Sequence, residues 1–209
     1  MPPGLALDID ETLSDTNIYW FTKLSELFGC PEGLSPREIA AKYRYSQRVP
    51  YWQTPEAYAW MEEARHGNEL QVELPLIENA KQMVEHINEI IPIVAYVTAR
   101  PESVREGTLR WLATHGFPTA PLIMKPLEIP TEEGVAWKAN LLATSYPDIL
   151  GIVDDHPGLM DALPVDYLGT IFLYNYTGPV RADLNIIACP TWEHIYTAVL
   201  ANRDQPDYR

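Results

Sequence analysis

Near its N-terminus the chain contains a short apolar run that ends in two aspartates one residue apart, reading Leu5-Ala6-Leu7-Asp8-Ile9-Asp10-Glu11-Thr12-Leu13. The apolar run predicts a short buried strand, and the acids stand at its carboxyl end, where α/β sheets bind ligands. Two neighbouring acids repel each other, and both stay ionised most easily beside a hard cation such as Mg²⁺. The alternative for Asp8 and Asp10 is a turn after the strand, which aspartate also favours.

Three later segments bear side chains of complementary chemistry. Two are strand-like apolar runs, Ile93–Val97 and Leu150–Val153, and the third is a helix-like stretch that begins near Val135. The polar residues that follow or lie within them are Thr98, Lys138, Asp154 and Asp155. Carboxylates hold a divalent cation, whereas a hydroxyl and an ammonium group bind phosphoryl oxygens. These strand ends therefore predict a phosphate and magnesium site, with helix capping by Thr98 and a strand-end turn at the paired acids as the structural alternatives.

In these four motifs and in their order, the sequence resembles the haloacid dehalogenase superfamily of phosphotransferases over most of the chain. The resemblance implies that Asp8 is the nucleophile and Asp10 the general acid and base. It also implies a Mg²⁺ cofactor held by Asp8, Asp10, Asp154 and Asp155. Dehalogenase members of the family do not use Mg²⁺ and lack the second aspartate in its acid/base role, so the presence of Asp10 favours phosphate chemistry.

The same resemblance assigns the binding of the transferring phosphoryl group to Thr98, Ala99, Arg100 and Lys138. The segment from Thr98 to Leu112 is similar to the second-motif helix of polynucleotide-phosphatase-like members, in which an arginine after the hydroxyl residue helps to bind phosphate. Similar helices occur in deoxyribonucleotidase-like members.

Two lysines compete for the third motif. Lys138 stands about sixteen residues before the paired acids, which fits some branches of the family. Lys125 follows the strand-like run Leu122–Met124, where other branches place their lysine. We favour Lys138 and interpret the other lysine as a surface residue.

The spacing of the motifs divides the chain. Residues 1–15 and 74–203 are predicted to form the α/β core, a Rossmann-like parallel sheet with helices on both faces, and residues 204–209 a frayed tail. Residues 16–73 form an insertion that looks like a type-one helical cap of the same family. Its predicted helices are Asn17–Phe28, Ser35–Tyr43 and Pro55–His66.

The remaining elements alternate after the insertion. A helix is predicted from Glu78 to Ile91 because its apolar residues recur at helical spacing. The further predictions are Ser103–His115, Val135–Thr144, Gly158–Leu163 and Thr191–Leu200 as helices and Ile93–Val97, Leu122–Met124, Gly151–Val153 and Thr170–Tyr174 as strands.

Composition narrows the classes of function. At 209 residues the chain can bury a substantial core. The net charge of −14 argues against broad binding to nucleic acid, whose partners are usually basic. We expect a cytoplasmic protein that makes no membrane contact, because neither a signal pattern nor a membrane-span-length apolar run is present. Cys30 and Cys189 are expected to be reduced thiols.

The insertion is rich in aromatic residues, of which most should form its own core. Any surplus, with Trp52 and Tyr45 as first candidates, would wall a pocket for a planar leaving group such as a nucleobase. The sequence therefore predicts a Mg²⁺-dependent phosphomonoester hydrolase acting on a small phosphate ester such as a nucleotide. The alternatives are a polynucleotide end phosphatase or phosphotransferase, and a non-catalytic phosphate-binding protein of the same fold.

Overall fold

The computed structural model describes residues 2–203, so the predicted frayed tail 204–209 lies outside the described residues. Six parallel strands form one sheet in the order β3-β2-β1-β4-β5-β6. Their bounds are β1 Gly4–Leu7, β2 Ile93–Pro101, β3 Leu122–Lys125, β4 Ile149–Asp154, β5 Thr170–Tyr174 and β6 Asn185–Cys189. The central strands are continuous apolar runs because both of their faces are covered.

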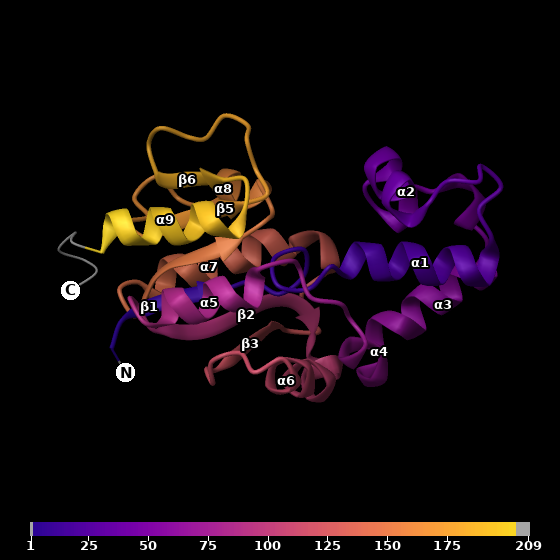
Figure 1. Ribbon diagram of the computed structural model, residues 1–209, viewed down its shortest axis with the longest axis horizontal. Coiled ribbons are helices and arrows are strands. Elements are labelled where there is room, and N and C mark those ends of the chain that lie inside the picture. Colours follow the sequence, from indigo (N-terminus) through magenta and orange to yellow (C-terminus); the bar gives the residue numbers. More distant parts are fainter. Residues whose placement is uncertain (1, 204–209) are drawn as a thin grey trace.

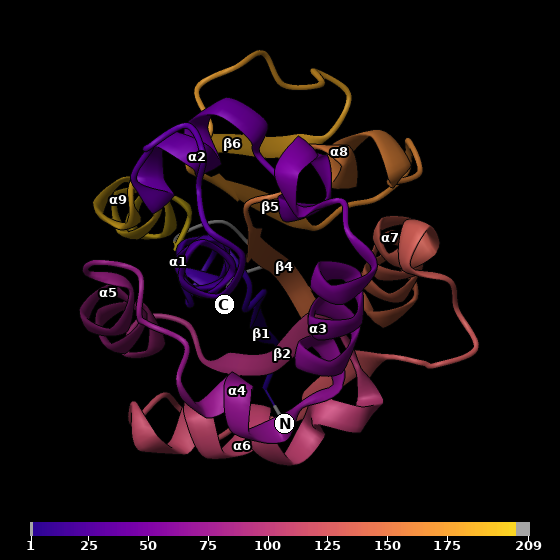
Figure 2. The ribbon, with the colours of Figure 1, turned by 90° about the vertical axis from the view of Figure 1, so that its right-hand side faces the viewer.

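Helices cover both faces of this sheet (Figure 2). On one face lie α5 (Ala80–Asn88), α6 (Arg105–Thr114) and α9 (Trp192–Asn202), which pack around the buried Trp111 and Trp192. On the other lie α7 (Gly134–Ser145) and α8 (Gly158–Ala162), which contribute Leu142 and Leu159 to a second apolar cluster. This arrangement confirms the predicted Rossmann-like α/β sheet. The sequence prediction missed β6, which is only partly buried.

The helices between β1 and α5 extend from one end of the sheet (Figure 1). They are α1 (Thr16–Phe28), α2 (Pro36–Tyr43), α3 (Pro55–His66) and α4 (Asn68–Val72), with two short 3₁₀ turns at Ser46–Arg48 and Pro50–Trp52. We call α1–α4 and these turns the inserted helices. A hydrophobic cluster around Phe21, Ile39 and Trp52 holds them together.

The inserted helices are attached to the sheet domain through α4, which the sequence prediction missed. The Asn68 Oδ1 atom accepts a hydrogen bond of 2.6 Å from the Gly107 amide of α6. A Cβ atom at Gly107 would lie 2.2 Å from the Asn68 carbonyl oxygen, so only glycine permits this approach. The close contact fixes one end of the inserted helices against α6.

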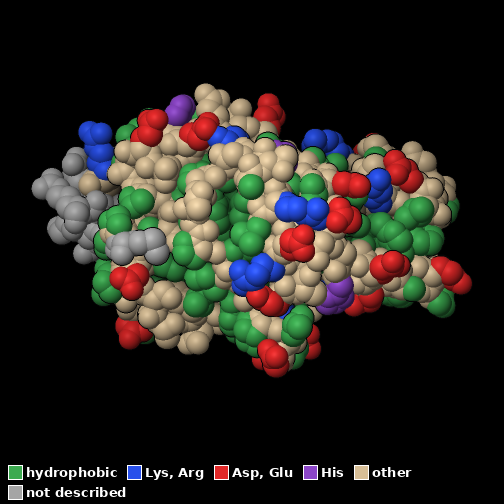
Figure 3. All heavy atoms as spheres, turned by 90° about the horizontal axis from the view of Figure 1, so that it is seen from below, with side chains coloured by type: hydrophobic (Ala, Val, Ile, Leu, Met, Phe, Trp, Pro, Cys, Tyr) green, Lys and Arg blue, Asp and Glu red, His purple; other side chains and the backbone are tan. Residues whose placement is uncertain are grey.

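The surface carries charges of both signs. On the face shown in Figure 3, lysine and arginine side chains lie among aspartate and glutamate side chains rather than in one patch. Within residues 2–203, no helix is both long enough and apolar enough to cross a membrane. Cys30 and Cys189 are both free thiols, as expected.

Candidate active site

The polar residues singled out in the sequence meet at the carboxyl edge of the sheet. Asp8 follows β1 directly, Asp154 is the last residue of β4, and Lys138 lies in α7. Because all six strands run in parallel, their carboxyl ends share one edge, which the chain then covers with the inserted helices. A cavity of about 640 Å³ lies between them, and its wall includes Asp8, Asp10 and Lys138.

Lys138 joins two of the buried carboxylates. Its Nζ atom lies 2.8 Å from Oδ1 of Asp8 and 2.6 Å from Oδ2 of Asp154. Burial would lower the pKa of Lys138, but the charges of Asp154 and Asp8 outweigh burial and raise it. For Asp8, burial is the largest influence and the neighbouring acids add to it, so its pKa rises to about 7 in spite of Lys138. The lysine is therefore a fixed cation at this site.

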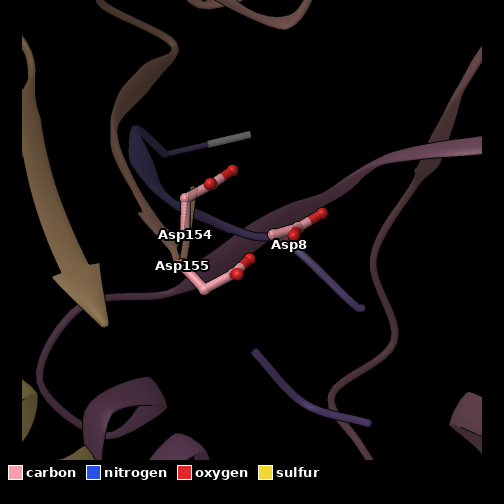
Figure 4. Close-up of side chains that lie close together, drawn as sticks. All are labelled: Asp8, Asp154 and Asp155. Atoms are coloured by element: carbon pink, nitrogen blue, oxygen red, sulfur yellow. The ribbon is translucent and has the colours of Figure 1, made fainter. Parts of the chain in front are cut away.

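Asp8, Asp154 and Asp155 form a compact acidic cluster (Figure 4). One carboxylate oxygen from each lies within 4.8 Å of the others. Burial, followed by the charges of Asp154 and Asp8, raises the pKa of Asp155 well above its usual range. Three oxygen donors that repel one another when ionised suit a hard divalent cation, which would relieve that repulsion. The donor set thus fits a bound Mg²⁺ chemically.

Asp10 has a different partner, the guanidinium group of Arg100 in β2. Nε of Arg100 donates to both carboxylate oxygens of Asp10, at 3.1 and 3.0 Å, and Nη2 donates to Oδ1 at 2.8 Å. Thr16 donates a further hydrogen bond of 2.6 Å to Oδ1. Burial would raise the pKa of Asp10, but the charge and hydrogen bonds of Arg100 outweigh it and lower the pKa. Arg100 therefore favours the ionised form of Asp10 and fixes the orientation of its carboxyl group.

Most N–H donors of the Arg100 guanidinium have partners within the protein. Its remaining contacts are with the hydroxyls of Ser14, at 3.1 Å, and Thr108, at 3.3 Å. The side chain is 5% exposed, and it lies beside Asp10 rather than beside Lys138. The sequence analysis had assigned it to the phosphoryl group, whereas the geometry places its donors on the carboxylate of Asp10.

The other residues assigned to phosphate binding lie at the same edge. Thr98 is fully buried, and its hydroxyl accepts a hydrogen bond of 3.2 Å from the Arg100 amide. Ala99 is exposed and lines the cavity. Of the two candidate lysines, Lys138 lies with Asp8, whereas Lys125 donates to the carbonyl oxygens of Pro126 and Ile129. The interpretation of Lys125 as a surface residue is wrong, because its side chain is buried against these carbonyls.

The structure adds residues that sequence reasoning did not identify. Thr16 donates to Asp10 and Ser14 accepts from Arg100, so both hydroxyls support the contact between these two residues. In the sequence, the only indication of this role was that two hydroxyl residues follow the first motif closely. Glu11, with a φ of 58°, accepts a hydrogen bond of 2.7 Å from the Asn17 amide and lines the cavity. Burial raises the pKa of Glu11 to about 7.

The two aromatic candidates of the insertion differ in position. Trp52 is fully buried in the core of the inserted helices, and its Nε1 donates to the Gly29 carbonyl oxygen. Its predicted place in a substrate pocket is therefore wrong, because its ring packs in the hydrophobic core of the inserted helices. Tyr45 does line the cavity, with the guanidinium groups of Arg44 and Arg48 5.3 and 5.0 Å from its ring centre.

Comparison with solved structures shows which fold this is. A dehalogenase crystal structure with an intermediate complex superposes with a TM-score of 0.56 at 11% identity, covering 94% of this chain and 96% of that one. A HAD-superfamily hydrolase from Ehrlichia chaffeensis gives 0.52 at 15% identity, covering 96% and 98%. A HAD family hydrolase from Deinococcus radiodurans R1, with bound phosphate and sodium, gives 0.50 at 16% identity, covering 95% and 88%.

These likenesses establish that the chain has the fold of the haloacid dehalogenase-like hydrolases. No protein-family model matches the sequence, and no curated protein matches it. Because the sequence identities are low, the likeness to these proteins extends to the fold alone. The chemistry of this chain depends on the residues of its own site.

Proposed function

We propose that the protein is a Mg²⁺-dependent phosphomonoester hydrolase that acts through an aspartyl-phosphate on Asp8. The observation that carries the proposal is the pairing of Asp8 with the Lys138 ammonium at 2.8 Å, inside a cavity that Asp10 also lines. A nucleophilic carboxylate, a fixed cation and a second carboxylate able to transfer a proton are the groups that this reaction needs. A protein that only binds phosphate has no use for the last of them.

The reaction begins with attack of an Asp8 carboxylate oxygen on the phosphorus atom. A bond from that oxygen to phosphorus forms while the bond to the leaving oxygen breaks, and the leaving alkoxide takes a proton from Asp10. Asp10 must therefore enter this step protonated, although Arg100 lowers its pKa, and the water of the second step returns the proton. In the second step Asp10 takes a proton from water, whose oxygen attacks phosphorus and releases Asp8 and inorganic phosphate. Arg100 holds Asp10 in one orientation for both transfers.

The transition state distributes negative charge over the phosphoryl oxygens, so electrostatic stabilisation supplies most of the rate. Lys138 provides one fixed charge from the protein. Mg²⁺ held by Asp8, the main-chain carbonyl of Asp10 and the Asp154/Asp155 pair would neutralise further charge on these oxygens. Thr98 and the Ala99 segment of β2 would complete the phosphoryl site.

The inserted helices act in this proposal as a cap that selects the substrate. They cover the site and bring Tyr45 to the cavity, so a small phosphate ester such as a nucleotide is the proposed substrate class. Polynucleotide end phosphatase or phosphotransferase activity is the second candidate, supported by the resemblance of the Thr98–Leu112 segment. The net charge of −14 favours a small ester over a polymer.

A substrate screen tests the proposal. Phosphate release would be measured with Mg²⁺ over nucleotides, sugar phosphates and 5′- and 3′-phosphorylated oligonucleotides, with halide release from 2-haloacids as a parallel assay. We expect phosphate release from small esters, loss of that activity in excess EDTA and its recovery on adding Mg²⁺. Full activity in EDTA would contradict the role of the metal, and halide release without phosphate release would contradict the reaction itself.

A further inference from the structure

A second cavity, of about 460 Å³, adjoins the first on the other side of Asp10. Asp10, Asn17, Tyr45 and Ala99 line both cavities, whereas Asp8 and Lys138 line only the first. A leaving alcohol must place its oxygen within hydrogen-bond reach of Asp10 if Asp10 protonates it. The second cavity is therefore positioned to hold the rest of the leaving group.

Lys125 forms part of the wall of this cavity and is 5% exposed. Its Nζ atom donates to the carbonyl oxygens of Pro126, at 3.2 Å, and Ile129, at 2.5 Å. An ammonium group has three N–H donors, so one remains after these two hydrogen bonds. The stem of the lysine is held close to the site, because a Cβ on Gly134 would lie 3.5 Å from both Lys125 Cδ and Ala99 Cβ.

The charge of Lys125 is unusual for this protein. The chain has a large excess of acids, and most of its lysines and arginines lie within 4.0 Å of a carboxylate. Within residues 2–203, Lys125 has no carboxylate at that distance. Arg44 and Arg48 share this property, but both are exposed to water. A buried ammonium without a counter-ion is costly, because desolvation is not repaid by an opposite charge.

The other charged groups of the second cavity are already paired. Asp10 is paired with Arg100 at 2.8 Å, and Glu62 with Arg65 at 3.5 Å. The ammonium of Lys125 is thus the uncompensated positive charge of the wall. An oxyanion of a ligand could accept its remaining N–H and supply the missing counter-charge.

We propose that the second cavity binds a second anionic group of the substrate, a carboxylate or a phosphate on the leaving alcohol, through Lys125. This assignment gives the substrate class more closely: phosphate esters of hydroxy acids, or bisphosphates. It rests on the proposed function for the placement of the leaving group beside Asp10. Lys125 then contacts the leaving group, and Lys138 remains the lysine of the transferring phosphoryl group.

Matched substrate pairs test the proposal. The carboxylate arm compares 3-phosphoglycerate with glycerol 3-phosphate, and the phosphate arm compares adenosine 3′,5′-bisphosphate with adenosine 5′-monophosphate. We expect wild-type kcat/KM to be about ten- to a hundredfold higher for the member of at least one pair that carries the second anionic group, the range for a hydrogen bond to a charged group. The pair that shows the preference tells whether the second anionic group is a carboxylate or a phosphate.

The preference should depend on the charge of Lys125. In Lys125→Gln, which keeps donors for the two carbonyls, the ratio within the pair should fall to about one, and Lys125→Arg should retain much of it. The matched control is Lys42→Gln, an exposed lysine paired with Glu32, in which the ratio should not change. If Lys125→Gln does not fold, Thr131→Glu places a competing carboxylate at an exposed position of the same wall, with Thr131→Gln as its control.

Two kinetic results would overturn the proposal. Equal losses for both members of each pair in Lys125→Gln would assign Lys125 to the transferring phosphoryl group. Absence of any preference in the wild type would leave the second cavity without an anion site. To separate these from failure of the proposed function, binding of the same pairs to the Asp8→Asn variant would be measured by calorimetry, with and without Lys125→Gln. A binding preference that depends on Lys125 would support the anion site even if no ester is hydrolysed, and its absence would contradict the site.

Discussion

The two aspartates of the first motif stand two residues apart but lie in opposite electrostatic surroundings. Asp8 shares the Lys138 ammonium with Asp154 inside a cluster of acids, and burial raises its pKa to about 7. Asp10 is only partly buried and is paired with the Arg100 guanidinium, which lowers its pKa. The comparison teaches that two aspartates in one short motif can have opposite pKa shifts, because their charged partners come from different elements of the fold.

The strongest way to separate the two acids is to replace each by asparagine. Asp8→Asn should lower kcat/KM at least about 10⁴-fold for every phosphate ester, because an amide does not replace the carboxylate nucleophile. Asp10→Asn should cost about 10²–10⁴-fold for alkyl phosphates but much less for 2,4-dinitrophenyl phosphate, whose leaving group needs no proton. Turnover near the wild-type rate in Asp8→Asn, with its fold confirmed by circular dichroism, would exclude Asp8 as the nucleophile.

The next largest effect should distinguish the two lysines. Lys138→Ala removes the cation that lies 2.8 Å from Asp8, and we expect kcat/KM for p-nitrophenyl phosphate to fall at least about a hundredfold. Lys125→Ala should lose much less on the same substrate, because its ammonium contacts two main-chain carbonyls instead. The reverse order would assign the transferring phosphoryl group to Lys125 and would also contradict our further inference.

A smaller effect should reveal how Asp10 is oriented. Arg100→Lys keeps a positive charge but cannot reproduce the three hydrogen bonds to the Asp10 carboxylate, so Asp10 should lose its fixed position. We expect a loss of about tenfold for alkyl phosphates and little loss for 2,4-dinitrophenyl phosphate. Equal losses for both classes of ester would indicate that Arg100 binds the phosphoryl group, as the sequence resemblance implied.

The smallest effect concerns the aromatic residues of the inserted helices. Tyr45→Ala should weaken turnover of nucleoside monophosphates by about five- to tenfold relative to p-nitrophenyl phosphate, at the low end of the 1–3 kcal/mol for a stacked base. Trp52→Ala should instead lower the free energy of unfolding by about 3–5 kcal/mol, because it leaves a cavity in a packed core. Thermal unfolding and the two kinetic assays measure these outcomes. An equal kinetic loss for both substrates in Tyr45→Ala would contradict the hypothesis that Tyr45 recognises a base.

The helices and strands that could be predicted were those with strong local signals. Pro55–His66 and Thr170–Tyr174 have the predicted bounds, because a proline-led helical period and a short run of β-branched, aromatic and leucine residues leave little ambiguity. The missed elements are α4, which is only five residues long, and β6, whose sequence is short and half-exposed. Both are stabilised by neighbours, α4 by the contact between Asn68 and Gly107 and β6 by pairing with β5. The boundary of the cap at residues 16–73 stays a prediction.

The sequence by itself determined which residues would gather at one edge of a parallel sheet. A strand signal is local, and parallel strands present all their carboxyl ends on one side, so Asp8, Thr98 and Asp154 were predictable from the residues around them. The tertiary structure alone decided the pairing of these groups. Arg100 and Asp10 are ninety residues apart, and their contact depends on how β2 packs beside β1 and on the hydroxyls around them. Side-chain partners are chosen by distances of a few ångströms in the folded chain, and no local pattern encodes those distances.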